Sequence, residues 1–175
     1  MKKSVFGAAL AAGASFLLAG TAGAQQDGQT PPPAKFTAQQ AASCAATFDW
    51  MLEFVDLDQA TGMSEQDIKR FYMETDIAAA MWTYELYAAM DGKTDDELKA
   101  AYIAGAESLL ESFPEDDTEE AGQQVVNTVM AKAEECGTTI AQAYPDGNHP
   151  VIQQMMAQAA AAQQQQQQQE APAAE

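Results

Sequence analysis

Apolar residues recur at steps of three and four along most of the chain between residues 37 and 160, the spacing that places side chains on one face of an α-helix. The most apolar such segment runs from Ile68 to Met90. From Ile77 onwards it is apolar or aromatic on nearly every side, and only Thr83 and Glu85 interrupt it. A helix of this kind is normally surrounded by other helices or by a partner subunit. We therefore expect the rest of the chain to pack around this segment.

Capping signals divide the remaining pattern into helices. Ser64 and Asp67, and also Thr94 and Glu97, have the three-residue spacing of a capping box, and Pro114 stops the helix that follows Thr94. The expected helices span about 37–57, 65–90, 95–113 and 118–136. Gly137 either ends or breaks the fourth helix, or residues 138–144 extend it. A short fifth helix from Pro150 would place five apolar residues on one side, namely Val151, Ile152, Met155, Met156 and Ala159.

The two cysteines lie on the apolar faces of the first and fourth expected helices. Cys44 shares its face with Phe48 and Met51, and Cys136 shares its face with Val129. A disulfide between them would close nearly the whole helical region and stabilise it by up to about 4 to 5 kcal/mol on a chain-entropy model. The sequence therefore predicts an all-α fold. It would be a small antiparallel bundle of four to five helices with one disulfide, with the second helix between the cysteine-bearing pair and the third.

The two ends of the chain are expected to be disordered or removed. Residues 1–24 have the basic start, apolar run and small-residue cleavage site of a secretory signal peptide, with cleavage between Ala24 and Gln25. Residues 25–35 form a proline-rich leader, and residues 161–175 form a glutamine-rich tail of low complexity. The helical bundle domain is thus expected to occupy residues 36–160.

Charge and cysteine usage indicate the compartment and exclude some partners. The chain has 26 acidic against 8 basic residues, a formal net charge of −18, which disfavours binding to nucleic acid and to anionic lipid. It could instead attract basic proteins or peptides. No segment after the signal peptide approaches a membrane span. With an even cysteine count, these features indicate an exported protein that is soluble in the periplasm or secreted.

Metal-binding patterns are present but incomplete. Asp56, Asp58 and Asp67 match three positions of a helix–loop–helix calcium motif, but Ala60 and Thr61 replace an oxygen donor and the turn glycine. We favour a capping role for Asp67 instead. The single histidine, His149, together with Met155 or Met156 would suit copper, although gap-filling in a helical core explains the methionines more simply.

Glu85 is the most unusual acidic residue, because it stands in the segment that is apolar on all sides. It would serve as a functional carboxylate, accept a hydrogen bond from Tyr72, Tyr84 or Tyr102, or reach solvent from an edge position. Glu107 and Glu111, one turn apart, would form a carboxylate pair or a solvated face.

No catalytic constellation is evident in the sequence, so we expect neither an enzyme nor a cofactor. The favoured function is a non-catalytic module for protein or peptide interaction, with Tyr84, Tyr87 and Met90 as the contact surface or as the seam of a homodimer. The alternatives are a periplasmic stress or chaperone-like protein and, last, a metal-binding protein. Small periplasmic acid-stress chaperones are similar in being helical with one disulfide, although their cysteines are much closer in sequence.

Overall fold

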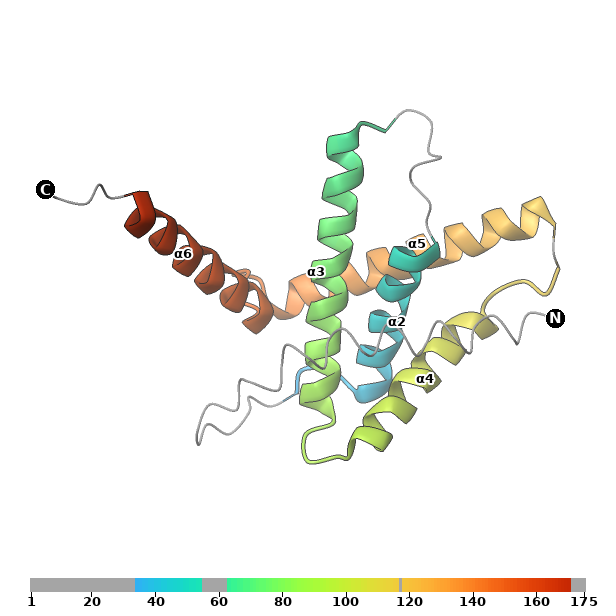
Figure 1. Cartoon of the computed structure of the whole chain (residues 1–175). Coiled ribbons are helices and arrows are strands. Elements are labelled where there is room, and N and C mark those ends of the chain that lie inside the picture. Colours follow the sequence, from blue (N-terminus) through green and yellow to red (C-terminus); the bar gives the residue numbers. More distant parts are fainter. Residues whose placement is uncertain (1–33, 55–62, 117, 171–175) are drawn as a thin grey trace, which may run out of the picture.

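The computed structural model describes residues 34–54, 63–116 and 118–170, and within these ranges it contains five α-helices and no strand (Figure 1). The helices are α2 (Ala38–Phe54), α3 (Glu65–Ala89), α4 (Asp95–Glu111), α5 (Glu119–Ala143) and α6 (Pro150–Glu170). The predicted all-α fold is confirmed. The expected signal peptide with its cleavage site at Ala24, nearly all of the leader, and Asp56 and Asp58 lie outside the described residues.

Side-chain caps set the starts of three helices. The Ser64 hydroxyl accepts a hydrogen bond from the Asp67 backbone N–H at 3.2 Å, and the Thr118 hydroxyl accepts one from the Ala121 N–H at 3.1 Å. At α4 the capping box is complete, because the Glu97 carboxylate also accepts a bond from the Thr94 N–H at 2.9 Å. These local bonds satisfy backbone donors that have no partner inside a helix, so the chain turns where the sequence predicted.

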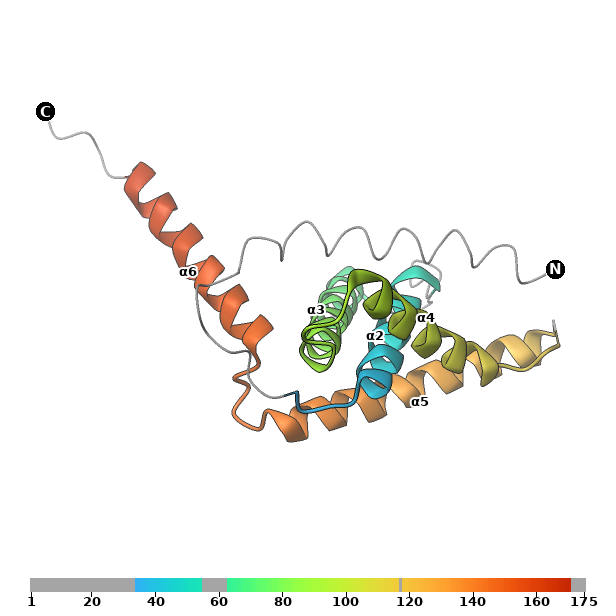
Figure 2. The same ribbon diagram turned by 90° about the horizontal axis from the view of Figure 1, so that it is seen from below.

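The central element is α2, which packs against α3, α4 and α5 (Figures 1 and 2). Our expectation that the Ile68–Met90 segment lies at the centre is wrong in this respect. The reason lies in residue size, because one face of α2 is made largely of alanine, which lets three neighbours approach its backbone. Its buried residues are Ala41, Ala42, Cys44, Ala45, Ala46, Thr47, Phe48 and Met51.

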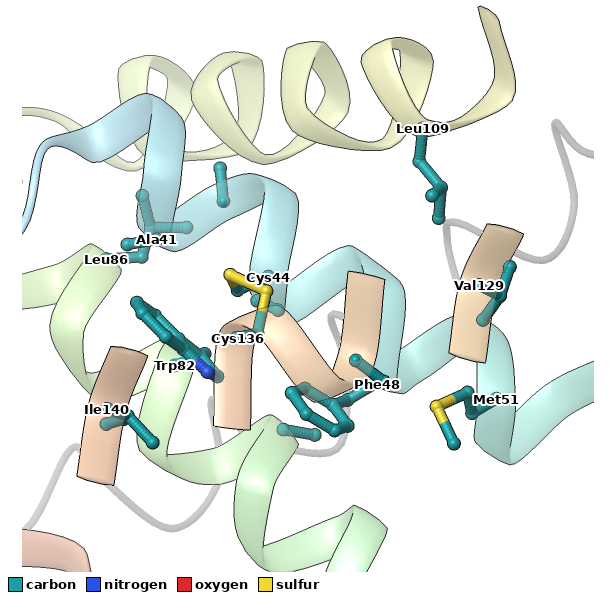
Figure 3. Packing of buried hydrophobic residues seen from close by; sticks show 14 residues of the cluster. Ala41, Cys44, Phe48, Met51, Trp82, Leu86, Leu109, Val129, Cys136 and Ile140 are labelled. Carbon is teal, nitrogen blue, oxygen red and sulfur yellow. A yellow bond between two sulfur atoms is a disulfide. The ribbon is translucent and has the colours of Figure 1, made fainter. Parts of the chain in front are cut away.

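The second half of α3 is nevertheless covered, as expected, and no residue from Ile77 to Met90 is exposed. Trp82 and Leu86 enter the core beside α2, at 0 % and 2 % exposure (Figure 3). Another part of the cover comes from the chain between α5 and α6, which returns to α3 and places His149 against it.

Gly105 allows the closest approach between two helices. A Cβ atom at this position would lie 2.5 Å from the carbonyl carbon of Ala42 and 2.7 Å from the amide nitrogen of Ser43. Both atoms belong to the backbone of α2, so they cannot move aside as a flexible side chain would. The α4 and α2 backbones therefore meet at a point that only glycine permits.

The disulfide joins Cys44 of α2 to Cys136 of α5, as predicted, with 5.7 Å between their Cα atoms. Both cysteines are buried, and Figure 3 shows them among Phe48, Trp82 and Ile140. The helix continues past Gly137 to Ala143, which is the extension that the sequence left open. Ile140, one turn beyond the glycine, is only 6 % exposed, so core packing holds the helix together past this position.

Only the beginning of α6 packs on the bundle, where Val151 and Ile152 are partly buried near α3. Beyond this point α6 projects away from the other helices (Figures 1 and 2), and its side chains are exposed from Gln153 through Gln166. We expected residues 161–175 to be a disordered tail, whereas the helix runs to Glu170, and residues 171–175 lie outside the described residues. Alanine and glutamine both favour helix, so backbone hydrogen bonds continue the element without a core.

The contact at Gly105 predicts that Gly105→Ala lowers the free energy of unfolding by about 1–3 kcal/mol, because the added methyl group collides with the α2 backbone. Gly137→Ala is the matched control. Its Cβ would meet nothing within 4 Å, and alanine should stabilise the helix interior by about 1 kcal/mol. Urea denaturation of both variants measures the two effects, and equal effects of the same sign would contradict the proposed packing.

Candidate functional site

The strongest candidate site is a buried polar cluster at the C-terminal half of α3. Glu85, on α3, is 1 % exposed, and His149, just before α6, is fully buried. Tyr144, the C-cap residue of α5, completes the cluster from a third direction. Three segments that are distant in sequence thus bring a carboxyl, an imidazole and a phenol together inside a helical protein.

One oxygen of Glu85 is shared by the other two groups. The Tyr144 hydroxyl donates a hydrogen bond to Glu85 Oε1 at 2.5 Å, and His149 Nε2 lies 3.2 Å from the same oxygen, off the line of an ideal hydrogen bond. The His149 ring also contacts the rings of Tyr84 and Tyr144 edge-on, with centroids 5.3 Å and 4.6 Å apart. Aromatic rings therefore flank the imidazole that faces the carboxylate.

The backbone of α6 fixes the tautomer of the imidazole. The Val151 N–H donates a hydrogen bond to His149 Nδ1 at 3.2 Å, so Nδ1 is an acceptor. In the neutral ring the proton then belongs on Nε2, the nitrogen that faces Glu85. One ring nitrogen therefore accepts a hydrogen bond from the first turn of α6, and the other points its proton toward the carboxylate on α3.

Lys35, in the segment before α2, covers the outer side of this cluster. Its ammonium group donates a hydrogen bond to the Ala143 carbonyl at 2.6 Å and lies 3.5 Å from the centroid of the Tyr144 ring. The first contact places a positive charge at the C-terminal end of α5, where the helix dipole favours it, and the second is a cation–π contact. Lys35 thereby holds the start of the described chain to the end of α5.

The electrostatics of the cluster favour an ionised Glu85. Burial by itself raises the pKa of Glu85, but the N–H and O–H donors of His149 and Tyr144 and the charge of Lys35 outweigh it and lower the pKa. For Tyr144 all causes act in one direction. Burial, the hydrogen bond to Glu85 and the nearby negative charges raise its pKa. At neutral pH the pair is therefore a carboxylate and a neutral phenol.

This arrangement suits the stabilisation of the buried Glu85 charge better than it suits catalysis. His149 is shielded from solvent, and both of its nitrogens already face a partner, so no lone pair is left for a metal or for an incoming proton donor. Both cysteines are in the disulfide. Within the described ranges, no group of three or more His, Cys, Asp or Glu side chains could hold a metal ion.

A second pair of polar groups, both partly buried, joins α2 to α4. The Tyr102 hydroxyl donates a hydrogen bond to Asp49 Oδ2 at 2.5 Å. Burial raises the pKa of Asp49, the hydrogen bond from Tyr102 opposes this, and the charges of Asp76 and Glu53 add to it, so the pKa is raised overall. Asp49 therefore responds to acid in the opposite sense to Glu85, although both are carboxylates bonded to a tyrosine.

The predicted site residues are only partly brought together. Glu85 is buried and accepts a hydrogen bond from a tyrosine, but the donor is Tyr144, so the three tyrosines expected from the sequence were wrong. Tyr102 donates its hydrogen bond to Asp49 instead. No local pattern pointed to Tyr144 or Asp49, because each reaches its partner across more than fifty positions of the chain.

The other candidates are dispersed. Tyr84 and Tyr87 are partly exposed, and Met90 packs against the core, so the expected contact surface is smaller than the sequence suggested. Asp67 is engaged by Ser64, whose hydroxyl donates to its carboxylate at 2.6 Å. Glu107 and Glu111 are exposed. The expected copper ligands differ in their surroundings, since His149 is buried whereas Met155 and Met156 are exposed.

Comparison with known proteins gives no relative. No family model matches the chain, and neither the curated proteins nor the solved structures contain a match. Among the described helices, none has the length and apolar character needed to cross a bilayer. The site must therefore be interpreted from its own geometry.

The opposite electrostatics of the two carboxylates predict opposite effects of neutralisation. At about pH 7, Glu85→Gln should lower the free energy of unfolding by about 1.5–3 kcal/mol, because it weakens charge-assisted hydrogen bonds in a buried site. Asp49→Asn should be neutral or stabilising, because its charge is disfavoured in the fold. Chemical denaturation of both variants at several pH values measures these differences.

The pH dependence follows from the direction of each shift. The folded-state pKa of Glu85 is lowered, so its contribution is present above the ordinary carboxyl pKa of 4.5 and is lost as pH falls through the folded value. The difference in the free energy of unfolding between the wild type and Glu85→Gln should therefore become smaller in acid. The partly buried Asp49 charge lowers the free energy of unfolding, and this loss should disappear as the carboxyl group takes up a proton. Equal losses for both variants at neutral pH would contradict the assignment.

Proposed function

We propose that this chain is an exported, non-catalytic helical module that binds an apolar and basic segment of a protein or peptide. One observation carries the proposal, namely that α6 projects from an acidic bundle as an exposed helix with apolar side chains and no charge before Glu170. The disulfide and the signal-peptide pattern of residues 1–24 support a periplasmic or secreted location, since disulfides persist in oxidising compartments.

The exposed apolar side chains of α6 have the spacing of a helix-binding stripe. Met155 is 42 % exposed and Met156 is 64 % exposed. Ile152, Met155, Ala159 and Ala162 follow one another at alternating steps of three and four, the pattern with which one helix packs against another. Methionine side chains are flexible and adapt to partners of different shape. This surface suits a helical apolar segment.

Charge favours a basic partner. The net charge of −18 leaves the bundle surface strongly acidic, which attracts a positively charged chain and repels an acidic one. Tyr84 and Tyr87, which are partly exposed on α3, would add aromatic contacts near the base of α6. The partner is thus expected to combine apolar and basic residues, as amphipathic basic helices do.

A homodimer would use the same stripe, because α6 is the uncharged part of a molecule whose copies otherwise repel one another. A second candidate function is that of a stress or chaperone-like protein active in acid, which the acid-sensitive contacts of Glu85 favour. A metal-binding role ranks last, since the described residues provide no ligand cluster.

The binding proposal predicts that a fluorescently labelled amphipathic basic peptide binds the disulfide-bonded protein at neutral pH. The double variant Met155→Gln/Met156→Gln should weaken binding by about tenfold or more, because it removes apolar contact area while glutamine preserves the helix. Gln153→Ala/Gln154→Ala, which changes exposed residues outside the stripe, should leave the affinity within about twofold. Fluorescence anisotropy measures all three affinities.

Two outcomes would count against this proposal. If the wild type does not bind the peptide, or if both double variants bind it equally well, the stripe is not the contact surface. Sedimentation equilibrium separates the homodimer from the binding module. A wild-type dimer that the methionine double variant dissociates would assign the stripe to a second copy of the chain.

A further inference from the structure

At Cys136 the chain is held to α2 by a covalent bond, whereas beyond Cys136 it is held to α3 by core packing and polar contacts. The disulfide fixes α5 to α2 at this residue, and a covalent bond between sulfur atoms is unaffected by moderate acid. Beyond it, Ile140 enters the core, and the polar contacts of Tyr144 and His149 then reach Glu85. After the first turn of α6, the side chains are exposed as far as Gln166. The polar part of the attachment of this segment therefore centres on a single carboxylate.

All the ionisable groups that act on Glu85 stabilise its charged form. They are His149 from the chain before α6, Tyr144 from α5 and Lys35 from the segment before α2. Tyr84, its neighbour on α3, contacts the His149 ring from another side. None of the groups that act on Glu85 comes from α2, and α6 has no ionisable side chain before Glu170. No neighbouring acid competes for a proton at this position.

A proton added to Glu85 would weaken each of these contacts at once. A neutral carboxyl group is a poorer acceptor than a carboxylate for the Tyr144 hydroxyl, and it loses its attraction for His149 and Lys35. The buried imidazole and the partly buried phenol would then lack the negative charge that faces them, which is costly for the imidazole in a site shielded from water. Opening to solvent relieves this cost.

We propose that Glu85, Tyr144 and His149 form an acid-released latch, which closes residues 137–152 over α3 at neutral pH and lets them separate when Glu85 takes up a proton. The rest of the bundle stays closed, because the disulfide holds α2 to α5 and the close backbone packing at Gly105 holds α4 to α2. The latch uncovers the C-terminal half of α3, including Tyr84. Its role in regulating a contact surface rests on the proposed binding function, whereas the opening itself does not.

Hydrogen–deuterium exchange of the full, disulfide-bonded chain tests the latch. In the wild type, peptides that cover residues 137–152 and 78–90 should keep their protection down to the ordinary carboxyl pKa of 4.5 and lose it as the pH falls further, after correction for intrinsic exchange rates. In Glu85→Gln, the same peptides should lose about tenfold protection or more already at neutral pH, while peptides from α2 and α4 keep theirs. Glu107→Gln, an exposed acid on α4, is the control and should behave as the wild type.

Tyr144→Phe provides a second test, should Glu85→Gln unfold as a whole. It removes one donor but keeps the charge, so the pKa of Glu85 rises and the loss of protection should begin at a higher pH than in the wild type. Unchanged protection of residues 137–152 in acid, or simultaneous opening of α2 and α4, would overturn the latch. Peptide binding at neutral pH is measured separately, so failure of the binding function leaves these exchange results unaffected.

Discussion

The disulfide between Cys44 and Cys136 is the constraint on which the arrangement of the helices depends. It ties α5 to α2 at the middle of the core, where Phe48, Trp82 and Ile140 surround it (Figure 3). The long α5 has many exposed side chains on both sides of this point, so its position is set largely by the covalent bond and the few residues beside it. Loop closure in the unfolded chain makes such a bond effective across a long separation.

Small residues and buried polar groups complete the fold in complementary ways. Alanine on α2 and Gly105 on α4 let backbones approach closely, which gives a tight but weakly apolar core. The protein also buries Glu85 and His149, and these are stable inside only because they face one another and Tyr144. Such a cluster specifies which segment covers α3, since an apolar substitute would pack without selecting its partner.

Local features of the chain could be predicted from sequence because their causes lie within a few residues. The caps at Ser64, Thr94 and Thr118 depend on bonds three positions along the chain. The disulfide followed from an even cysteine count with one pairing. The local pattern left open whether α5 ends at Gly137. The helix continues because a local penalty of about 1 kcal/mol is small beside the burial of residues on either side. The expected hydrogen-bond partners of Glu85 were wrong because the packing of the helices decides which tyrosine lies beside it.

The sequence by itself determined the helical class, the helix starts, the disulfide pair and the acidic surface, since periodicity, capping and charge are properties of neighbouring residues. Only the tertiary structure decided that α2 rather than α3 is central, that Tyr144 and His149 meet Glu85, and that α6 leaves the bundle. The physical reason is that these contacts join residues far apart in the chain. Their formation depends on the size and fit of whole helix faces, which the local pattern does not encode.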